Sequence, residues 1–286
     1  MTSNLTAGDR QIDLSSPVCM GIINATPDSF SDGSELKLSD QPIFKVDLNK
    51  TLQRAESMVA AGALILDVGG ESTRPGAAAV SEEEQLSRVI PIVEIIRSNI
   101  DVCISVDTSS AVVMKAAIAA GAEMINDIRA LTEEGVLTAL AKSSVAICLM
   151  HMQGEPRTMQ QTIEYANVVD EVYGFFEERV NQCRAAGIKK ERLCIDPGFG
   201  FGKTLQNNYE LLKNLANFSQ LDIPILIGLS RKSMIGDVVG RAVGQRLAGS
   251  ITAAVHGLIE GANIIRTHDV AATMDAIRVN SFFQQI

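Results

Sequence analysis

The stretch CISVDTSSAVVMKAAIAAGAEMIND, residues 103–127, contains the pattern that decides the fold. It begins with a short apolar run at 103–106, continues with an amphipathic stretch at 110–120, and ends with a second apolar run at 124–127. Apolar runs without polar alternation are typical of strands that are covered on both faces of a parallel sheet. Gly121 follows the amphipathic stretch, where a helix commonly ends on a left-handed residue. The stretch therefore predicts a strand, a helix and a second, parallel strand.

The same alternation recurs along the rest of the chain. The predicted strands are 18–23, 64–68, 103–106, 124–127, 145–150, 193–196, 225–228 and 264–266. The predicted helices are 46–61, 82–98, 110–120, 133–142, 165–186, 207–217, 243–261 and 271–283. Gly62, Gly187 and Gly261 follow helical stretches as Gly121 does, and Thr108 or Ser109 is expected to cap the helix near residue 110. Eight such units favour a closed (β/α)8 barrel, the TIM barrel, over an open doubly wound sheet.

Length and composition fit one domain of this kind. The chain has 286 residues, of which 46% are apolar and 21% charged, as is ordinary for a folded globular protein. Although about 150 residues per domain would allow two domains, no linker or repeat divides the chain. We expect residues 1–286 to form a single domain, with residues 1–16 as a polar N-terminal extension. The five widely spaced cysteines are expected to be buried thiols of a cytoplasmic protein.

Charge and hydropathy exclude several classes of partner. The 25 basic and 34 acidic residues give 25 − 34 = −9, and no basic block stands out, so a nucleic-acid surface is not expected. No uncharged apolar run approaches the roughly 18 residues of a membrane span. An anionic substrate would therefore have to meet a local cluster of cations.

Polar residues gather at the carboxyl ends of the predicted strands. They are Asn24, Asp67, Asp107, Asn126, Asp127, His151, Asp196, Ser230, Arg231, Lys232, Arg266 and His268. In a parallel barrel these ends converge on one mouth, where catalysis takes place. The alternative is that each polar residue merely caps the next helix. Capping explains single positions, but it does not predict both signs of charge around the whole ring, so we expect an enzyme.

Four segments are more specific than this pattern. They read GIINATPDSFSDG at 21–33, DVGGESTRPG at 67–76, IDPGFGFGK at 195–203 and GLSRKS at 228–233. The first two form long loops after strands 1 and 2. In the third, glycines let the backbone approach a ligand, and Phe199 or Phe201 could lie against a flat one, although the spacing of a P-loop is missing. The fourth opens a helix with Ser and Lys, which favours an anion site.

In combination these segments resemble the dihydropteroate synthases, from Val18 to Arg278. The resemblance implies a TIM barrel that condenses 6-hydroxymethyl-7,8-dihydropterin diphosphate with 4-aminobenzoate, giving 7,8-dihydropteroate and diphosphate. It implies a transferase of folate biosynthesis that uses Mg²⁺ and for which sulfonamides compete with aminobenzoate. It also implies a cytoplasmic homodimer formed through the late helices, within 238–259. A dissociative substitution at the pterin methylene is the expected mechanism.

The resemblance also assigns roles to residues. The implied contacts of the pterin diphosphate are Thr73, Asp107, Asn126, Asp196, Lys232, Arg266 and His268. The implied contacts of 4-aminobenzoate are Phe30, Arg74, Pro75 and Ser233, and the implied protein ligand of Mg²⁺ is Asn24. The implied catalytic residues are Asp32, Lys232 and Arg266, with Asp32 facing the developing cation. The chemistry agrees, because a carboxylate matches the adjacent N–H donors of a pterin edge and cations match a diphosphate.

Other functions remain open at this point. A related pterin barrel could pass a methyl group from methyltetrahydrofolate to a corrinoid partner, but it would not need the Thr73-Arg74-Pro75 loop or the cations for a diphosphate. A non-catalytic pterin-binding subunit would be expected to lack Asn24, Lys232 or Arg266. A generic phosphate-binding barrel would leave the acidic residues unexplained. With three scattered histidines and no ligand-spaced cysteines, a zinc site is not expected.

Overall fold

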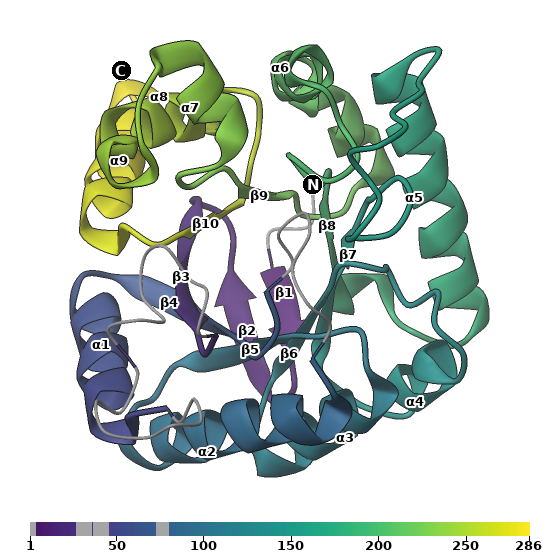
Figure 1. Ribbon diagram of the computed structural model, residues 1–286, viewed down its shortest axis with the longest axis vertical. Helices are drawn as coiled ribbons and strands as arrows, with labels where there is room; N and C mark the ends of the chain where they lie inside the picture. Colours follow the sequence, from purple (N-terminus) through teal and green to yellow (C-terminus); the bar gives the residue numbers. More distant parts are fainter. Residues whose placement is uncertain (1–3, 27–35, 37–45, 73–79) are drawn as a thin grey trace.

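The structure is a computed structural model that describes residues 4–26, 36, 46–72 and 80–286. Eight parallel strands form its main sheet, in the order β8-β7-β6-β5-β4-β3-β10-β9 (Figure 1). They are β3 (Val18–Asn24), β4 (Ala63–Gly69), β5 (Cys103–Asp107), β6 (Met124–Asp127), β7 (Ala146–Met150), β8 (Leu193–Asp196), β9 (Leu226–Gly228) and β10 (Ile264–Thr267). An isolated bridge between Ile195 and Ile225 joins the two ends of this order. The barrel is thus nearly closed, which confirms the predicted fold class.

Helices surround the strands (Figure 1). The α-helices are α1 (Leu48–Ala60), α2 (Glu82–Asn99), α3 (Ala111–Ala120), α4 (Val136–Ala141), α5 (Val168–Ala185), α6 (Leu205–Lys213), α7 (Ser233–Val239), α8 (Leu247–Ile259) and α9 (Val270–Phe283). Short 3-10 turns cover Lys190–Arg192, Leu215–Leu221 and Val243–Gln245. The prediction of one helix over 243–261 was too long, because its first turn is 3-10 and the α-helix begins only at Leu247. The list of predicted helices also lacked α7, which has seven residues.

The predicted helix ends can be checked at single residues. Gly62, Gly121, Gly187 and Gly261 all have positive φ, from 90° to 109°, as the prediction requires. At the start of α3 the prediction was wrong. Ser110 itself is the cap, and its Oγ accepts from the backbone N–H groups of Val112 and Val113.

The N-terminal residues form a hairpin that the sequence analysis did not foresee. Strands β1 (Asn4–Ala7) and β2 (Arg10–Asp13) pair antiparallel and lie within the ring of strands in Figure 1. Leu5 and Ile12 are buried in a cluster with side chains from inside the barrel, including Met20, Ile65 and Ile264. The segment is polar in composition, but its buried side chains close the amino end of the barrel. Pairs with Asp101 and Glu123 hold Arg10 of the hairpin at this end.

The same strands carry apolar residues at one level and polar residues at the next. On β4, Ile65 belongs to the interior cluster, and Asp67 follows two residues later. Side chains two apart on a strand point to the same face, so Asp67 also points into the barrel, nearer its carboxyl end. The fold therefore places a polar layer directly above an apolar one.

Two further expectations concern the whole chain. The five cysteines are buried with free thiols, as predicted. No helix within the described residues is long and apolar enough to cross a membrane.

Candidate active site

A pocket of about 620 Å³ lies at the carboxyl ends of the strands. Its lining includes six of the residues predicted from the sequence, namely Asn24, Asp107, Lys232, Ser233, Arg266 and His268. Asn126 and Asp196 also lie at this end of their strands, and each is only 4% exposed. Phe30, Asp32, Thr73, Arg74 and Pro75 lie outside the described residues. The structure thus brings together eight of the predicted residues at one end of the barrel.

A buried carboxylate, Asp67 of β4, organises the floor of the site. Its Oδ2 accepts from Arg266 Nε at 2.6 Å and from Asn126 Nδ2 at 3.1 Å. Arg266 also donates from Nη2 to Asp107 Oδ2 at 2.9 Å. Burial opposes the charge on Arg266, but Asp67 and Asp107 outweigh it and raise the pKa of the guanidinium. Burial raises the pKa of Asp107 to about 7, and Arg266 opposes this rise. The guanidinium is therefore locked as a cation between two carboxylates.

Two acceptors in this floor have no hydrogen-bond partner among the described residues. They are Oδ1 of Asp67 and Oδ1 of Asn126, both buried. A buried acceptor without a partner costs roughly 1–3 kcal/mol, so native proteins rarely leave one unexplained. A ligand that presents N–H donors would satisfy both atoms. The site therefore has two buried acceptors, next to Arg266 of the pocket lining, that suit a donor-rich ligand.

A second pair, Asp196 and Lys232, lies across the site from Asp107. Asp196 Oδ1 accepts from the N–H of Gly198 at 2.8 Å. Burial raises the pKa of Asp196, and Lys232 is the main charge that opposes the rise. Lys232 Nζ donates to the carbonyl of Phe199 and lies 4.9 Å from the ring centre of Phe201. Burial lowers the pKa of Lys232 to about 8, against the pull of Asp196. Lys232 lines the pocket, and burial disfavours the charged form of both Lys232 and Asp196.

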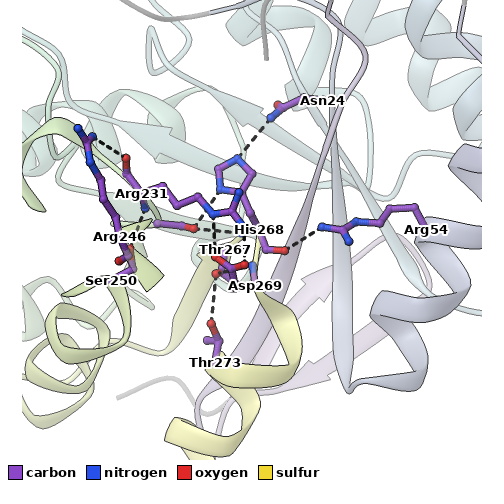
Figure 2. Close-up of polar contacts among 10 residues, drawn as sticks. Asn24, Arg54, Arg231, Arg246, Ser250, Thr267, His268, Asp269 and Thr273 are labelled. Atoms are coloured by element: carbon purple, nitrogen blue, oxygen red, sulfur yellow. Dashed lines mark hydrogen bonds and ion pairs between the residues drawn. The ribbon is translucent and has the colours of Figure 1, made fainter. Parts of the chain in front are cut away.

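The rim of the pocket near β3 joins Asn24 to His268 (Figure 2). Asn24 Nδ2 lies 3.4 Å from His268 Nε2, and His268 Nδ1 lies 3.0 Å from Ser230 Oγ. If the amide N–H donates to Nε2, the ring is neutral and donates its Nδ1–H to Ser230. Arg54 of α1 donates to the carbonyl of His268 at 3.1 Å. Contacts from three parts of the chain therefore fix this histidine.

The loop before α7 is held by a second arginine. Arg231 has a left-handed backbone with φ of 58° and pairs with Asp269. Arg246 Nη1 donates to the carbonyl of Arg231 at 3.1 Å (Figure 2). It also donates to the carbonyl of Lys232 at 3.2 Å. Ser233 is the first residue of α7, so the prediction that GLSRKS opens a helix is confirmed. These contacts place Lys232 and Ser233 on the pocket wall.

Sequence reasoning noted Asp67 at a strand end but gave it no role. The available signal was its position two residues after Ile65, an inward-facing residue of the same strand. Ser230 was likewise noted at a strand end without a role, and Arg246 was missed, because their contacts join segments far apart in the chain. Of the two phenylalanines in the glycine-rich loop, Phe201 lies beside Lys232, whereas Phe199 is fully buried.

Comparison with known proteins agrees with this geometry. The family of pterin binding enzymes matches residues 20–268. The chain is 51% identical over 275 residues to the dihydropteroate synthase of Haemophilus influenzae. The matched region covers 96% of this chain and 97% of that enzyme. The Yersinia pestis dihydropteroate synthase, solved with a sulfonamide drug, has a TM-score of 0.93 and 46% identity, covering 99% and 100% of the two chains. The Xanthomonas albilineans enzyme, solved with 4-aminobenzoic acid, has a TM-score of 0.90 and 44% identity over both whole chains. The chain described here therefore belongs to the dihydropteroate synthase family.

Proposed function

We propose that this chain condenses 6-hydroxymethyl-7,8-dihydropterin diphosphate with 4-aminobenzoate, giving 7,8-dihydropteroate and diphosphate in folate biosynthesis. The observation that carries the proposal is a pair of buried acceptors, on Asp67 and Asn126, that have no partner among the described residues. They lie behind Arg266, which bonds to Asp67 and lines the pocket together with Lys232. Reduced pterin supplies ring and amine N–H donors, and its diphosphate supplies the charge that the cations match. The two solved relatives, with 4-aminobenzoic acid and with a sulfonamide, support the second substrate.

The pterin ring is recognised by side chains from four strands or strand ends. Asp196 accepts two adjacent N–H groups of the pterin edge, and Asn126 offers both a donor and an acceptor to the neighbouring ring atoms. Asp107 takes a further ring N–H, and Lys232 donates to the pterin carbonyl. In support, Asn126 and Asp196 are buried and Asp107 is half-buried, all at one end of the barrel, where a polar ligand would satisfy them.

The diphosphate is bound by Arg266, His268 and Thr73, with Mg²⁺ held on the protein side by Asn24. The donor set fits a hydrated Mg²⁺, because a neutral amide oxygen suits this hard cation when water and phosphate oxygens complete its shell. No group of three or more His, Cys, Asp or Glu suited to a metal occurs in the part of the chain that the structure describes. The ion would therefore depend on the substrate for most of its ligands. When bound, it stabilises negative charge on the departing diphosphate.

The aminobenzoate lies on the outer side of the pterin. Ser233, at the start of α7, contacts its carboxylate, and Phe30, Arg74 and Pro75 of the two long loops complete the pocket. Support comes from the position of Ser233 on the pocket wall, next to Lys232. A pocket of this size has room beyond the pterin for a second flat ligand.

The reaction is a dissociative substitution. The bond between the pterin methylene and the diphosphate oxygen breaks first, and positive charge spreads into the dihydropterin ring. Asp32 faces this developing cation, while Arg266 and Lys232 hold the leaving group and the ring. The aromatic amine, unprotonated near neutral pH, then forms the new carbon–nitrogen bond and releases its proton to water. No strong general base is required, in keeping with the absence of a His–carboxylate pair from the floor described above.

The chain acts as one domain, in the cytoplasm, and as a homodimer. Exposed apolar side chains on the three late helices support a contact with a second copy, namely Val238 and Val239 of α7, Leu247 and Ile259 of α8, and Val279, Phe282 and Phe283 of α9. A cluster of exposed apolar residues of this kind is typical of a protein interface.

The alternatives predict different chemistry from the same pocket. A methyl-transferring pterin barrel would have no use for a cation pair such as Lys232 and Arg266 beside the pterin floor. A binding subunit would hold the pterin without turnover. We find no observation that favours either of these over the synthase.

A diphosphate-release assay tests the proposal. The chain is incubated with dihydropterin diphosphate, with and without 4-aminobenzoate, and with EDTA as a control. We expect diphosphate release that depends on aminobenzoate, forms dihydropteroate and stops with EDTA. Binding of pterin without release in any arm would support a binding subunit and overturn the synthase.

A further inference from the structure

Lys203 is a buried lysine immediately after the glycine-rich loop of β8, and sequence reasoning gave it no role. It is 3% exposed, and its Nζ lies within 3.3 Å of four acceptors. These are Nδ1 of His151 at 2.9 Å, the carbonyl of His151 at 3.3 Å, and the carbonyls of Gly198 and Phe201, both at 3.0 Å. All four partners are neutral. The amino group therefore ties the loop after β7 to the loop after β8.

The two loops are packed too closely for ordinary side chains at their contacts. A Cβ on Gly198, where φ is +70°, would lie 1.8 Å from the carbonyl oxygen of His151. A Cβ on Gly202, where φ is +59°, would lie 2.4 Å from the carbonyl oxygen of Gln153. The backbone N–H of His151 also donates to the carbonyl of Asp196 at 2.9 Å. Lys203 thus sits at the centre of a rigid junction.

This junction supports both members of the charged pair in the pocket. The N–H of Gly198 donates to Asp196 Oδ1, and the carbonyl of Phe199 accepts from Lys232 Nζ. The two carbonyls that Lys203 holds, at 198 and 201, flank this segment. We propose that Lys203 is a positioning residue, whose buried amino group fixes segment 198–201 so that Asp196 and Lys232 meet the pterin in the working geometry. The inference rests on the proposed function, because it assigns the support of that same site.

The same contacts determine the protonation state of His151. Burial lowers the pKa of Lys203 well below its usual value, and the charge of Asp196 opposes this. Nζ carries N–H groups in either form, and it donates one to Nδ1 of His151. His151 must in that case be neutral, with its proton on Nε2. Burial lowers the pKa of His151 strongly, and the charge of Lys203 adds to this effect. The ring packs edge-on against Phe175, with 4.9 Å between centroids.

Arg192, at the other end of the same strand, offers a matched control. It is 7% exposed, and it donates to the carbonyls of Val145 and Leu140, at 2.8 and 3.0 Å. It too is a buried cation whose partners are neutral, but it lies at the amino end of β8, away from the pocket. A purely structural role for Lys203 would make the two cations equivalent.

The experiment compares Lys203→Met, Lys203→Gln and Arg192→Met in the full chain. Thermal unfolding gives Tm, and calorimetry with the dihydropterin diphosphate gives Kd. We expect Lys203→Met to weaken pterin binding by roughly 10- to 100-fold, the range seen when the partner behind a metal ligand is removed. Lys203→Gln, which keeps N–H donors, should recover part of the loss. Arg192→Met should lower Tm and leave Kd within about twofold. Equal Kd values for Lys203→Met and Arg192→Met would overturn the inference.

A second measurement is made on the wild-type chain and needs no change at Lys203. The sequence has three histidines, so the ring ¹⁵N signals can be assigned by substitution of His256 and His268. We expect one histidine, His151, to stay neutral with an unprotonated Nδ1 from about pH 5 to pH 8. Titration of His151 near its ordinary pKa of about 6.5 would refute the contact with Lys203. A wild-type chain that neither binds the pterin nor releases diphosphate would instead refute the proposed function, whatever the histidine spectra show.

Discussion

The two ends of the barrel are built from the same strands but have opposite character. At the amino end, Met20, Cys103 and Ile264 pack with the hairpin in an apolar cluster. Further along the same strands come Asn24, Asp107 and Arg266, which line the pocket. Only two to four residues separate each apolar member from its polar counterpart, a distance of about 7–14 Å. Each strand therefore contributes residues for stability at its amino end and residues for function at its carboxyl end.

The two layers also differ in how they treat polar groups. The amino end buries apolar side chains, and its charged residues, such as Arg10, pair at the outer edge of the hairpin. The carboxyl end buries Asp67 and Asp196 and half-buries Lys232, and burial shifts the pKa of Asp196 upward and that of Lys232 downward. Active sites commonly trade stability for function in this way. Changes in the two layers should therefore have separable effects.

The largest effect is expected from Asp196→Asn. The amide cannot accept two N–H donors from the pterin and loses the charge that attracts Lys232, so binding should weaken at least about 1,000-fold, or about 4 kcal/mol. Calorimetry with dihydropterin diphosphate measures this loss. Cys194→Ala, two residues earlier on the same face of β8, is the matched control from the apolar layer, and it should lower Tm with an unchanged Kd. Unchanged affinity in Asp196→Asn would contradict its assignment.

The next largest effect is expected on stability, from a change in the apolar layer at the hairpin. Leu5 is fully buried, and Leu5→Ala should reduce the free energy of unfolding by about 2–5 kcal/mol, because it leaves a cavity inside the barrel. Thermal and urea unfolding measure the loss, and steady-state kinetics should show unchanged KM values in the folded fraction. If the variant kept wild-type stability but lost pterin affinity, the two layers would not be separable.

Lys232→Met should lower activity and raise thermal stability. It removes the donor to the pterin carbonyl, so kcat/KM should fall by about 100-fold. It also removes a charge whose burial lowers the pKa to about 8, so the Tm at pH 7 should rise by a few degrees. A variant with normal kcat/KM would remove Lys232 from the site.

The stability gain of Lys232→Met should depend on pH. A lysine with a lowered pKa contributes stability above its unfolded pKa of about 10.4, and this contribution is lost as pH falls through about 8. The stability gain of Lys232→Met should therefore be larger at pH 7 than at pH 10. In the wild type, kcat/KM should fall as pH rises through about 8, and the variant should lack that limb. A limb that persists in the variant would belong to another group.

The smallest effect is expected from Phe30→Leu or Pro75→Ser. These loop residues are proposed to touch only the aminobenzoate, so its KM and the Ki of sulfonamides should change by a few fold, about 1 kcal/mol or less. The Kd of the pterin diphosphate should stay constant. An equal loss for both ligands would place these residues elsewhere.

The sequence predicted the strands well because a parallel barrel strand is an uninterrupted apolar run. Strands 124–127 and 193–196 were predicted to the residue, and the others end within two residues of the prediction. The hairpin was not predicted, because its two strands have four residues each and alternate polar with buried positions. A pattern this short cannot be distinguished from a loop. The start of α7 was predicted from GLSRKS, but its extent was not, because the helix has only seven residues and contains Gly236.

The site was predictable where its residues lie at strand ends, and less so elsewhere. Asp107, Asn126, Asp196 and Arg266 all stand at or near the end of a predicted strand, and all lie at the site. Asp67 and Lys203 act through hydrogen bonds to other protein groups, and such contacts depend on the packing of distant segments. Their roles become visible only when the distances are known. The binding roles of the individual residues stay predictions.

The hairpin has a consequence for synthesis of the protein. Leu5 and Ile12 are translated well before Ile264 of β10, although all three belong to one buried cluster. Strand β10, which pairs with both β3 and β9, is translated after both of them. Contacts this far apart in sequence form slowly. The hairpin therefore keeps Leu5 exposed during synthesis until β10 has been made.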